Sequence, residues 1–329
     1  MSNEFTWIPF YMEFADKLRD YKERRGELVD IIKDVYKNTG IKLPTLEKDG
    51  AVFDIDPFTV FGLFNKGITD TKRITIAIEF KNSLGIKAQV PSDFNGIPIL
   101  NNMSATFYGF IGDRKENDID NLWNAFIAAL DFADRKSENT KTEFCKWFDI
   151  VRVQFCVKWN ITIGLFWIRP YSFLNLDSQN REYLKKNNSL PDDFRRDFKT
   201  KAKSVPSAND YIYLCDLCLK EIKRNDGEYY NFPSFSHYVW ISGNDLDNDD
   251  LSNPDYSDYS DVFSQIVECD NDRNTWLLTW NPTKFDWTDF DYAVNTTAHR
   301  SDEHRRSQPC NDRLRFAQTF QFLHDEACV

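Results

Sequence analysis

The chain has 329 residues, of which 41% are hydrophobic and 16% aromatic, so it is long enough to form two packed domains. Its seven cysteines follow no framework spacing, and no uncharged apolar run reaches the roughly 18 residues that a membrane span needs. These features argue against a disulfide-stabilised scaffold and against a membrane partner. The chain opens without a signal-peptide pattern, and we expect a reduced, cytoplasmic protein.

The net charge of −11 is concentrated in one segment. Between Arg224 and Arg273 there are twelve acidic residues and no lysine or arginine, so this segment carries −12 and the rest of the chain +1. An acidic chain repels nucleic acid, but a local acidic segment leaves the rest of the chain able to bind it.

Apolar residues recur at helical spacing in the N-terminal half. Residues 10–37 predict either one helix or two helices separated near Gly26. Asp56 is expected to cap the following helix, and Pro57 suits its first turn.

The clearest helical period covers residues 118–134, with Asp118 as the expected N-cap. Trp123 and Phe126 share its apolar stripe and are predicted to be core residues. A short helix is also expected over residues 211–222.

Residues 151–203 hold eleven lysines and arginines against five acidic residues, interleaved with aromatic side chains. Cations neutralise phosphates and exposed aromatic rings stack on unpaired bases, so this stretch is the best candidate for a nucleic-acid surface. We predict that its basic face contains Arg169, Lys185, Arg195 and Arg196. The alternative is an aromatic core with solvated charges around it.

Asp70 followed by Glu79-Phe80-Lys81 has the spacing of a metal-dependent nuclease site. The run 72–84 is compatible with a strand or a helix. A strand would place Glu79 and Lys81 on one face, where carboxylates could hold magnesium and the lysine could orient water. A helix would separate the two side chains.

No other motif predicts a metal or a cofactor. Cys215 and Cys218 form half of a zinc pair without a second C-x-x-C, and on a helix they are expected to pack inward. The chain contains no Gly-x-x-x-x-Gly-Lys-Ser/Thr, so it lacks the phosphate-binding loop of nucleotide hydrolases.

Near the C-terminus, an aromatic strand from Trp276 to Trp280 leads into an Asn281-Pro282 turn and then to Trp287. This segment resembles the opening strand of an EVE domain, a PUA-like β-barrel that reads modified bases in nucleic acid. The resemblance implies that Trp280 and Trp287 stack on a flipped base. Only 54 residues run from Trp276 to Val329, so we expect an incomplete barrel.

The N-terminal region resembles that of McrB-like restriction proteins, in which an AAA+ motor follows the specificity modules. The strings that carry this resemblance lie at residues 5–11, 54–67, 112–123 and 159–177. The resemblance implies a place in a restriction system that attacks modified DNA, and we expect its motor or nuclease to be a separate subunit.

Together these observations predict a mainly α domain over residues 1–242, an acidic linker over 243–272, and a partial α/β segment over 273–329. The expected function is non-catalytic recognition of DNA, with modified cytosine as the candidate base and without a metal or cofactor. Two alternatives are a metal-dependent nuclease that uses Glu79 and Lys81, and a protein-interaction scaffold in the same system.

Overall fold

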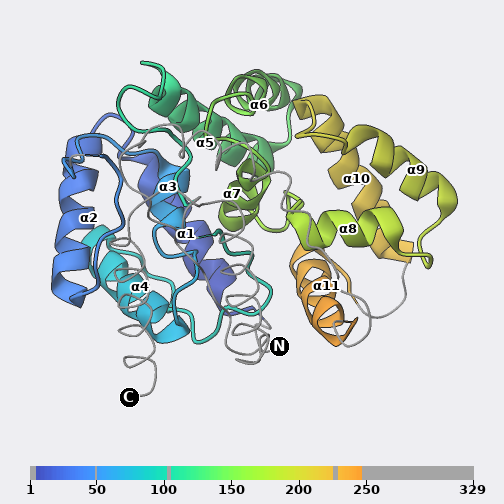
Figure 1. Cartoon of the computed structure of the whole chain (residues 1–329), viewed down its shortest axis with the longest axis horizontal. Coiled ribbons are helices and arrows are strands. Elements are labelled where there is room, and N and C mark those ends of the chain that lie inside the picture. The colour runs from blue at the N-terminus through green and yellow to red at the C-terminus, as the bar shows by residue number, and fades with distance from the viewer. Residues whose placement is uncertain (1–4, 49, 102–104, 225–228, 247–329) are drawn as a thin grey trace, which may run out of the picture. The chain divides into compact units, whose positions relative to one another are not determined.

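Helices dominate the computed structural model, which describes residues 5–48, 50–101, 105–224 and 229–246. Within these ranges the structure contains no strand, and its one β-bridge joins Lys66 to Leu100. The prediction of a mainly α domain is therefore confirmed for the described residues. The helices are α1 (Trp7–Arg19), α2 (Arg25–Thr39), α3 (Pro57–Gly62), α4 (Asp70–Leu84), α5 (Asp118–Arg135), α6 (Glu138–Val151), α7 (Asn160–Ile168), α8 (Ser178–Lys186), α9 (Asp192–Lys201), α10 (Ala208–Arg224) and α11 (Phe232–Leu246) (Figure 1).

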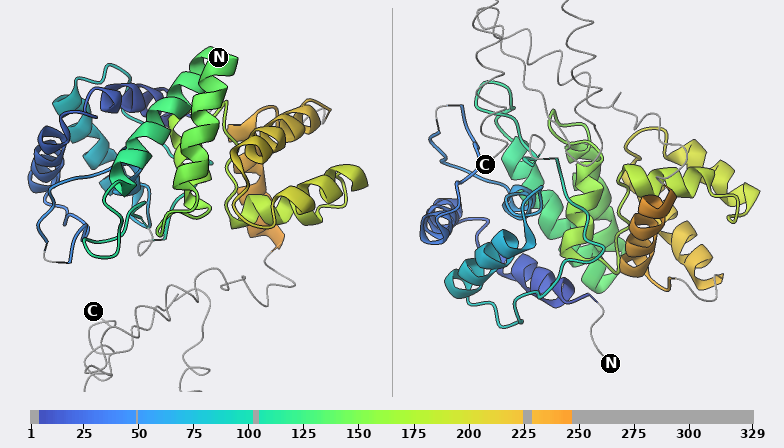
Figure 2. Two further views of the ribbon diagram at one scale, coloured as in Figure 1. Left: turned by 90° about the horizontal axis from the view of Figure 1, so that it is seen from above. Right: turned by 60° about the horizontal axis from the view of Figure 1, so that its bottom comes forward.

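The helices form three neighbouring groups. Helices α5, α6 and α7 lie between the group α1–α4 and the group α8–α11 (Figures 1 and 2). Helix α7 contacts α1, α3 and α5, and α10 contacts α6, so the middle group joins the other two. Helix α11 extends through Leu246, into the range predicted as linker.

The predicted helix over residues 10–37 is two helices, but Gly26 does not separate them. Helix α1 ends at Arg19 and α2 begins at Arg25, so Gly26 lies in the first turn of α2. Helix α2 ends where Gly40 adopts a left-handed φ of 66°, a conformation that glycine reaches without steric cost.

Two predicted helix caps have different outcomes. The Asp56 carboxylate accepts hydrogen bonds from the amides of Phe58 at 2.8 Å and Thr59 at 3.0 Å, and Pro57 opens α3, as predicted. Asp118 is not the N-cap of α5. That position belongs to Asn117, while the Asp118 carboxylate accepts from the Lys115 amide at 3.0 Å.

The core of the N-terminal group is aromatic. The Phe14 ring lies 4.9 Å from Phe61 and 5.0 Å from Phe80, which brings α1, α3 and α4 together. Trp123 and Phe126 on α5 are fully buried, which confirms their predicted place in the core. The Trp123 indole also donates to the Ile55 carbonyl at 2.9 Å, so its polar edge is satisfied.

Residues 70–84 form a helix, and the strand alternative is wrong. The Thr69 hydroxyl accepts from the Lys72 amide at the start of α4, and Gly85 ends the helix with a φ of 64°. The buried positions Ile76, Ala77 and Phe80 follow a helical period.

Cys215 and Cys218 are buried in α10, which confirms that the pair packs inward. Burial raises the pKa of the Cys215 thiol to about 12, so this thiol stays protonated at neutral pH. Among the described residues no group of three or more histidine, cysteine and acidic side chains is placed to hold a metal ion. No described helix has the length and apolar character that crossing a membrane requires.

Asp56 is expected to make the stability of the protein depend on pH. Burial raises the pKa of this carboxyl from its ordinary 3.8 to about 7, against the opposing effect of its hydrogen bonds from Thr59 and Phe58. Between about pH 4 and pH 7, the folded protein therefore keeps a proton on Asp56 that the unfolded chain has released. The stability contributed by Asp56 is full below about pH 4 and is lost as the pH rises through about 7.

Urea unfolding at pH 5.5 and pH 8 measures this effect. Asp56→Asn removes the titration and retains a cap acceptor, so the variant should lose less stability than the wild type between the two pH values. Asp30→Asn, an exposed substitution on α2, is the control and should follow the wild type. An identical pH dependence in the Asp56→Asn variant would contradict the assignment.

Candidate nucleic-acid interface

Helix α9 is anchored to the core by one aromatic pair. Phe194 and Phe198 are four residues apart, both are buried, and their rings stack at 6.3 Å. Because this stripe faces inward, the opposite face of α9 is left to polar and charged residues. Acidic residues fill the first turn and basic residues the last turn, an order that complements the helix dipole.

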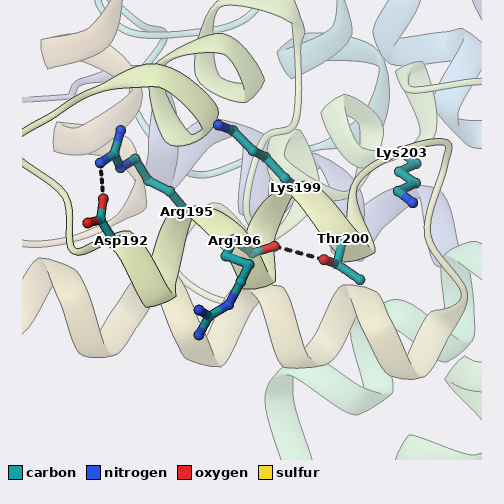
Figure 3. Close-up of a pocket in the computed structure, with 6 residues that line it drawn as sticks. All are labelled: Asp192, Arg195, Arg196, Lys199, Thr200 and Lys203. Atoms are coloured by element: carbon teal, nitrogen blue, oxygen red, sulfur yellow. Dashed lines mark hydrogen bonds and ion pairs between the residues drawn. The ribbon is translucent and has the colours of Figure 1, made fainter.

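The outer face of α9 borders a basic hollow of about 380 Å³. Its lining residues are Asp192, Arg195, Arg196, Lys199, Thr200 and Lys203 (Figure 3). Four of the six side chains are cationic and one is a carboxylate, so the lining of the hollow carries a net positive charge.

Arg195 is fixed within the basic hollow. Its guanidinium forms an ion pair with Asp192 and donates to the Asn188 side-chain oxygen at 2.9 Å. Only 19% of its side chain is exposed, and its Nε atom is buried without a hydrogen-bond partner. Arg195 therefore contributes charge from a fixed position.

The other cations of the hollow are Arg196, Lys199 and Lys203, which we call the free cations. All three are exposed, and their side chains have no hydrogen-bond or ion-pair partner among the described residues. Figure 3 shows Lys199 extending to the same side of α9 as Arg195, and Arg196 extending to the other side. The Thr200 hydroxyl donates to the Arg196 carbonyl at 2.8 Å, so this hydroxyl is already used.

Two further charges of α9, on Asp197 and Lys201, are engaged by α10. The Asp197 carboxylate accepts from the Tyr213 hydroxyl at 2.9 Å, and Lys201 forms an ion pair with Asp210. The Lys201 ammonium holds the pKa of Asp210 below its ordinary value. Asp197 therefore has its partner on α10, and it is not paired with a free cation.

The prediction for Arg169 is wrong. This residue follows the buried helix α7, and its side chain is 5% exposed. Its guanidinium forms ion pairs with Asp16 at 2.6 Å and with Asp134 at 2.7 Å. Arg169 connects α7 to α1 and α5, and it is not part of a basic surface.

The other predicted cations divide between two helices. Arg195 and Arg196, both on α9, line the basic hollow. Lys185 lies on α8, which contacts α9, but it is half-buried and is not among the residues that line the hollow. Lys199 and Lys203 belong to the same basic stretch. The four-residue steps from Arg195 to Lys199 and from Lys199 to Lys203 are the signal that could have selected them.

Glu79 and Lys81 do not form the predicted nuclease arrangement. The Glu79 carboxylate accepts from the Asn38 amide at 3.1 Å, whereas the Lys81 ammonium donates to the carbonyls of Ile86 at 2.9 Å and Lys87 at 3.0 Å. Asp70 is paired with Arg73. On helix α4 these side chains serve separate structural contacts because the strand that would have aligned them is absent.

Trp280 and Trp287, the predicted base-stacking residues, lie outside the described residues. The same holds for the whole segment from Trp276 to Val329 that resembles an EVE domain.

Comparison with known protein families gives a match over most of the described residues. A family model described as a domain of unknown function, DUF8425, matches residues 7–242, which is more than half of the chain. The chain belongs to the DUF8425 family. No curated protein sequence and no solved structure matches the chain. The DUF8425 region spans all of α1 to α10 and most of α11, so the basic hollow lies within it.

Proposed function

We propose that this DUF8425 protein is a non-catalytic DNA-recognition component of a modification-dependent restriction system. The basic hollow on α9 carries the DNA-binding part of the proposal, because its four cations face a single carboxylate. The restriction context rests on the sequence resemblance to the N-terminal region of McrB-like proteins. A separate motor or nuclease subunit would then act on the DNA that this chain selects.

The chemistry of the basic hollow suits a polyanion better than a small neutral ligand. Duplex DNA carries closely spaced phosphates with condensed counterions, and each cation that contacts a phosphate releases counterions. The free cations have no partner among the residues that the structure describes, so within this part of the chain a phosphate would replace only water and salt. Phosphate contacts position a protein on DNA, and base contacts select the sequence or the modification. We assign the base contacts to Trp280 and Trp287 on sequence alone.

The competing scaffold function predicts no affinity for DNA, and the nuclease function predicts cleavage. Neither gains a supporting observation from the described residues. Lys81 and Glu79, the candidate catalytic pair, are occupied by structural contacts, and the free cations favour a polyanionic partner.

Fluorescence anisotropy with the full chain tests the proposal. Labelled duplexes that differ only in plain or modified cytosine should both bind at about 50 mM salt, and the modified duplex should bind more tightly. Trp280→Ala should reduce the preference for the modified duplex and leave binding to the plain duplex in place. Neither duplex should be cut in the presence of magnesium. Absence of binding by correctly folded protein would contradict DNA recognition and favour the scaffold.

A further inference from the structure

We infer that the basic hollow on α9 binds the phosphate backbone of duplex DNA and does not read base edges. This inference rests on the proposed function and specifies which part of DNA the DUF8425 region contacts. It follows from the side chains that line the hollow, from their existing partners, and from the elements that flank α9.

To read a base, a side chain must present hydrogen-bonding groups that complement the donors and acceptors on the edge of that base. Arginine makes a bidentate contact to guanine, and asparagine or glutamine makes one to adenine. Among the described residues, no asparagine or glutamine lines the basic hollow. Arg195 already donates to Asn188 and pairs with Asp192, which leaves Arg196 as the one arginine of the hollow whose guanidinium is uncommitted among the described residues.

The free cations fit phosphate contacts. Lys199 and Lys203 are flexible point charges, which attract phosphate without requiring one orientation. Arg196 emerges from the opposite side of α9 from Lys199, so the two can contact phosphates at different positions along a backbone (Figure 3). The hydroxyl of Thr200 is bound to the Arg196 carbonyl and is not needed for this contact.

The neighbours of α9 restrict which of its faces reaches DNA. Helices α8 and α10 both contact α9, and its aromatic stripe is buried. Asp197 and Lys201 are engaged by Tyr213 and Asp210 on α10. A recognition helix lies in the major groove and directs several side chains to base edges. Helix α9 offers only its outer face, which carries Arg196 and Lys199, and Lys203 follows two residues beyond the end of the helix.

A charge-removal variant tests this inference. The triple variant Arg196→Gln, Lys199→Gln, Lys203→Gln removes the free cations and keeps long polar side chains. The matched control is Lys33→Gln, Lys37→Gln, Lys42→Gln, which removes the same charge from exposed positions on and just beyond α2, in the group opposite α9. Thermal unfolding should show that both variants remain folded, because none of the six side chains is buried.

Affinities of the full chain and both variants are measured on unrelated duplex sequences and on plain and modified cytosine. The α9 variant should lose affinity by the same factor, within about threefold, on every duplex. Its log–log salt slope should become shallower by about 0.9 for each phosphate contact removed, up to about 2.7 for three. The control variant should retain most of the wild-type affinity and slope.

The outcomes separate this inference from the proposed function. A loss confined to one sequence or to the modified duplex would show that these side chains read bases, and would overturn the inference. Unchanged affinity in the α9 variant, with a wild-type chain that binds DNA, would place the backbone contact elsewhere and overturn it as well. Absence of DNA binding by the wild-type chain would overturn the proposed function and the inference together.

Discussion

Replacing Phe126 with alanine will lower the free energy of unfolding by about 3–5 kcal/mol. The Phe126 side chain is fully buried on α5, with its ring 5.6 Å from Phe58 and 6.1 Å from Trp123. The substitution removes an aromatic ring from a site where α5 packs against α3, and the rigid neighbours can only partly fill the cavity. Chemical denaturation followed by tryptophan fluorescence and circular dichroism measures the change.

Phe53→Ala is the matched control for this prediction. It removes the same ring from a position that is 72% exposed, so the free energy of unfolding should change by no more than about 0.5 kcal/mol. If the two substitutions had similar costs, or if Phe126→Ala cost less than about 1 kcal/mol, the packing described for α5 would be wrong.

Replacing Arg169 with alanine will cost about 3 kcal/mol of stability, and the folded variant will bind DNA as the wild type does. The substitution removes two ion pairs and the packing of a side chain that is 5% exposed. The loss of one partner of a buried ion pair costs about 3–5 kcal/mol. We expect the lower end, because Asp16 and Asp134 are 56% and 46% exposed and water can solvate the carboxylates left behind.

Arg196→Ala gives the opposite result and is the comparison for Arg169→Ala. Its stability should stay within about 0.5 kcal/mol of the wild type because its side chain is exposed and unpaired in the described structure. Its DNA affinity should fall. A stable Arg169→Ala variant that loses DNA binding would restore Arg169 to the basic surface and would contradict its structural role.

Local sequence patterns predicted those helices that have one uninterrupted apolar repeat or one clear capping residue. The helix around Trp123 and Phe126 has an uninterrupted apolar stripe, and Asp56-Pro57 combines a cap with a residue preorganised for the first turn. Residues 72–84 were ambiguous because isoleucine recurs at every second position, at Ile74, Ile76 and Ile78, as it does in many strands. The buried residues of α4 recur at helical spacing, and Ile78 is 41% exposed. The alternating isoleucines therefore did not indicate which positions are buried.

The candidate site was only partly predictable because one residue type has two roles in the same basic stretch. Arg169 and Arg196 are both arginines among aromatic residues. Arg169 is buried by carboxylates that lie 153 and 35 residues earlier in the chain, a pairing that no local pattern contains. Arg196 is exposed because Phe194 and Phe198 determine which side of α9 faces inward, which is a local pattern.

The most direct test of DNA recognition by α9 is the affinity of the full chain for duplex DNA across about 50–200 mM salt. If the free cations contact phosphates, the logarithm of the association constant should fall linearly with the logarithm of the salt concentration, with a slope steeper than about −2. A folded protein that shows no binding, or binding with a slope near zero, would contradict the proposal that this surface recognises DNA.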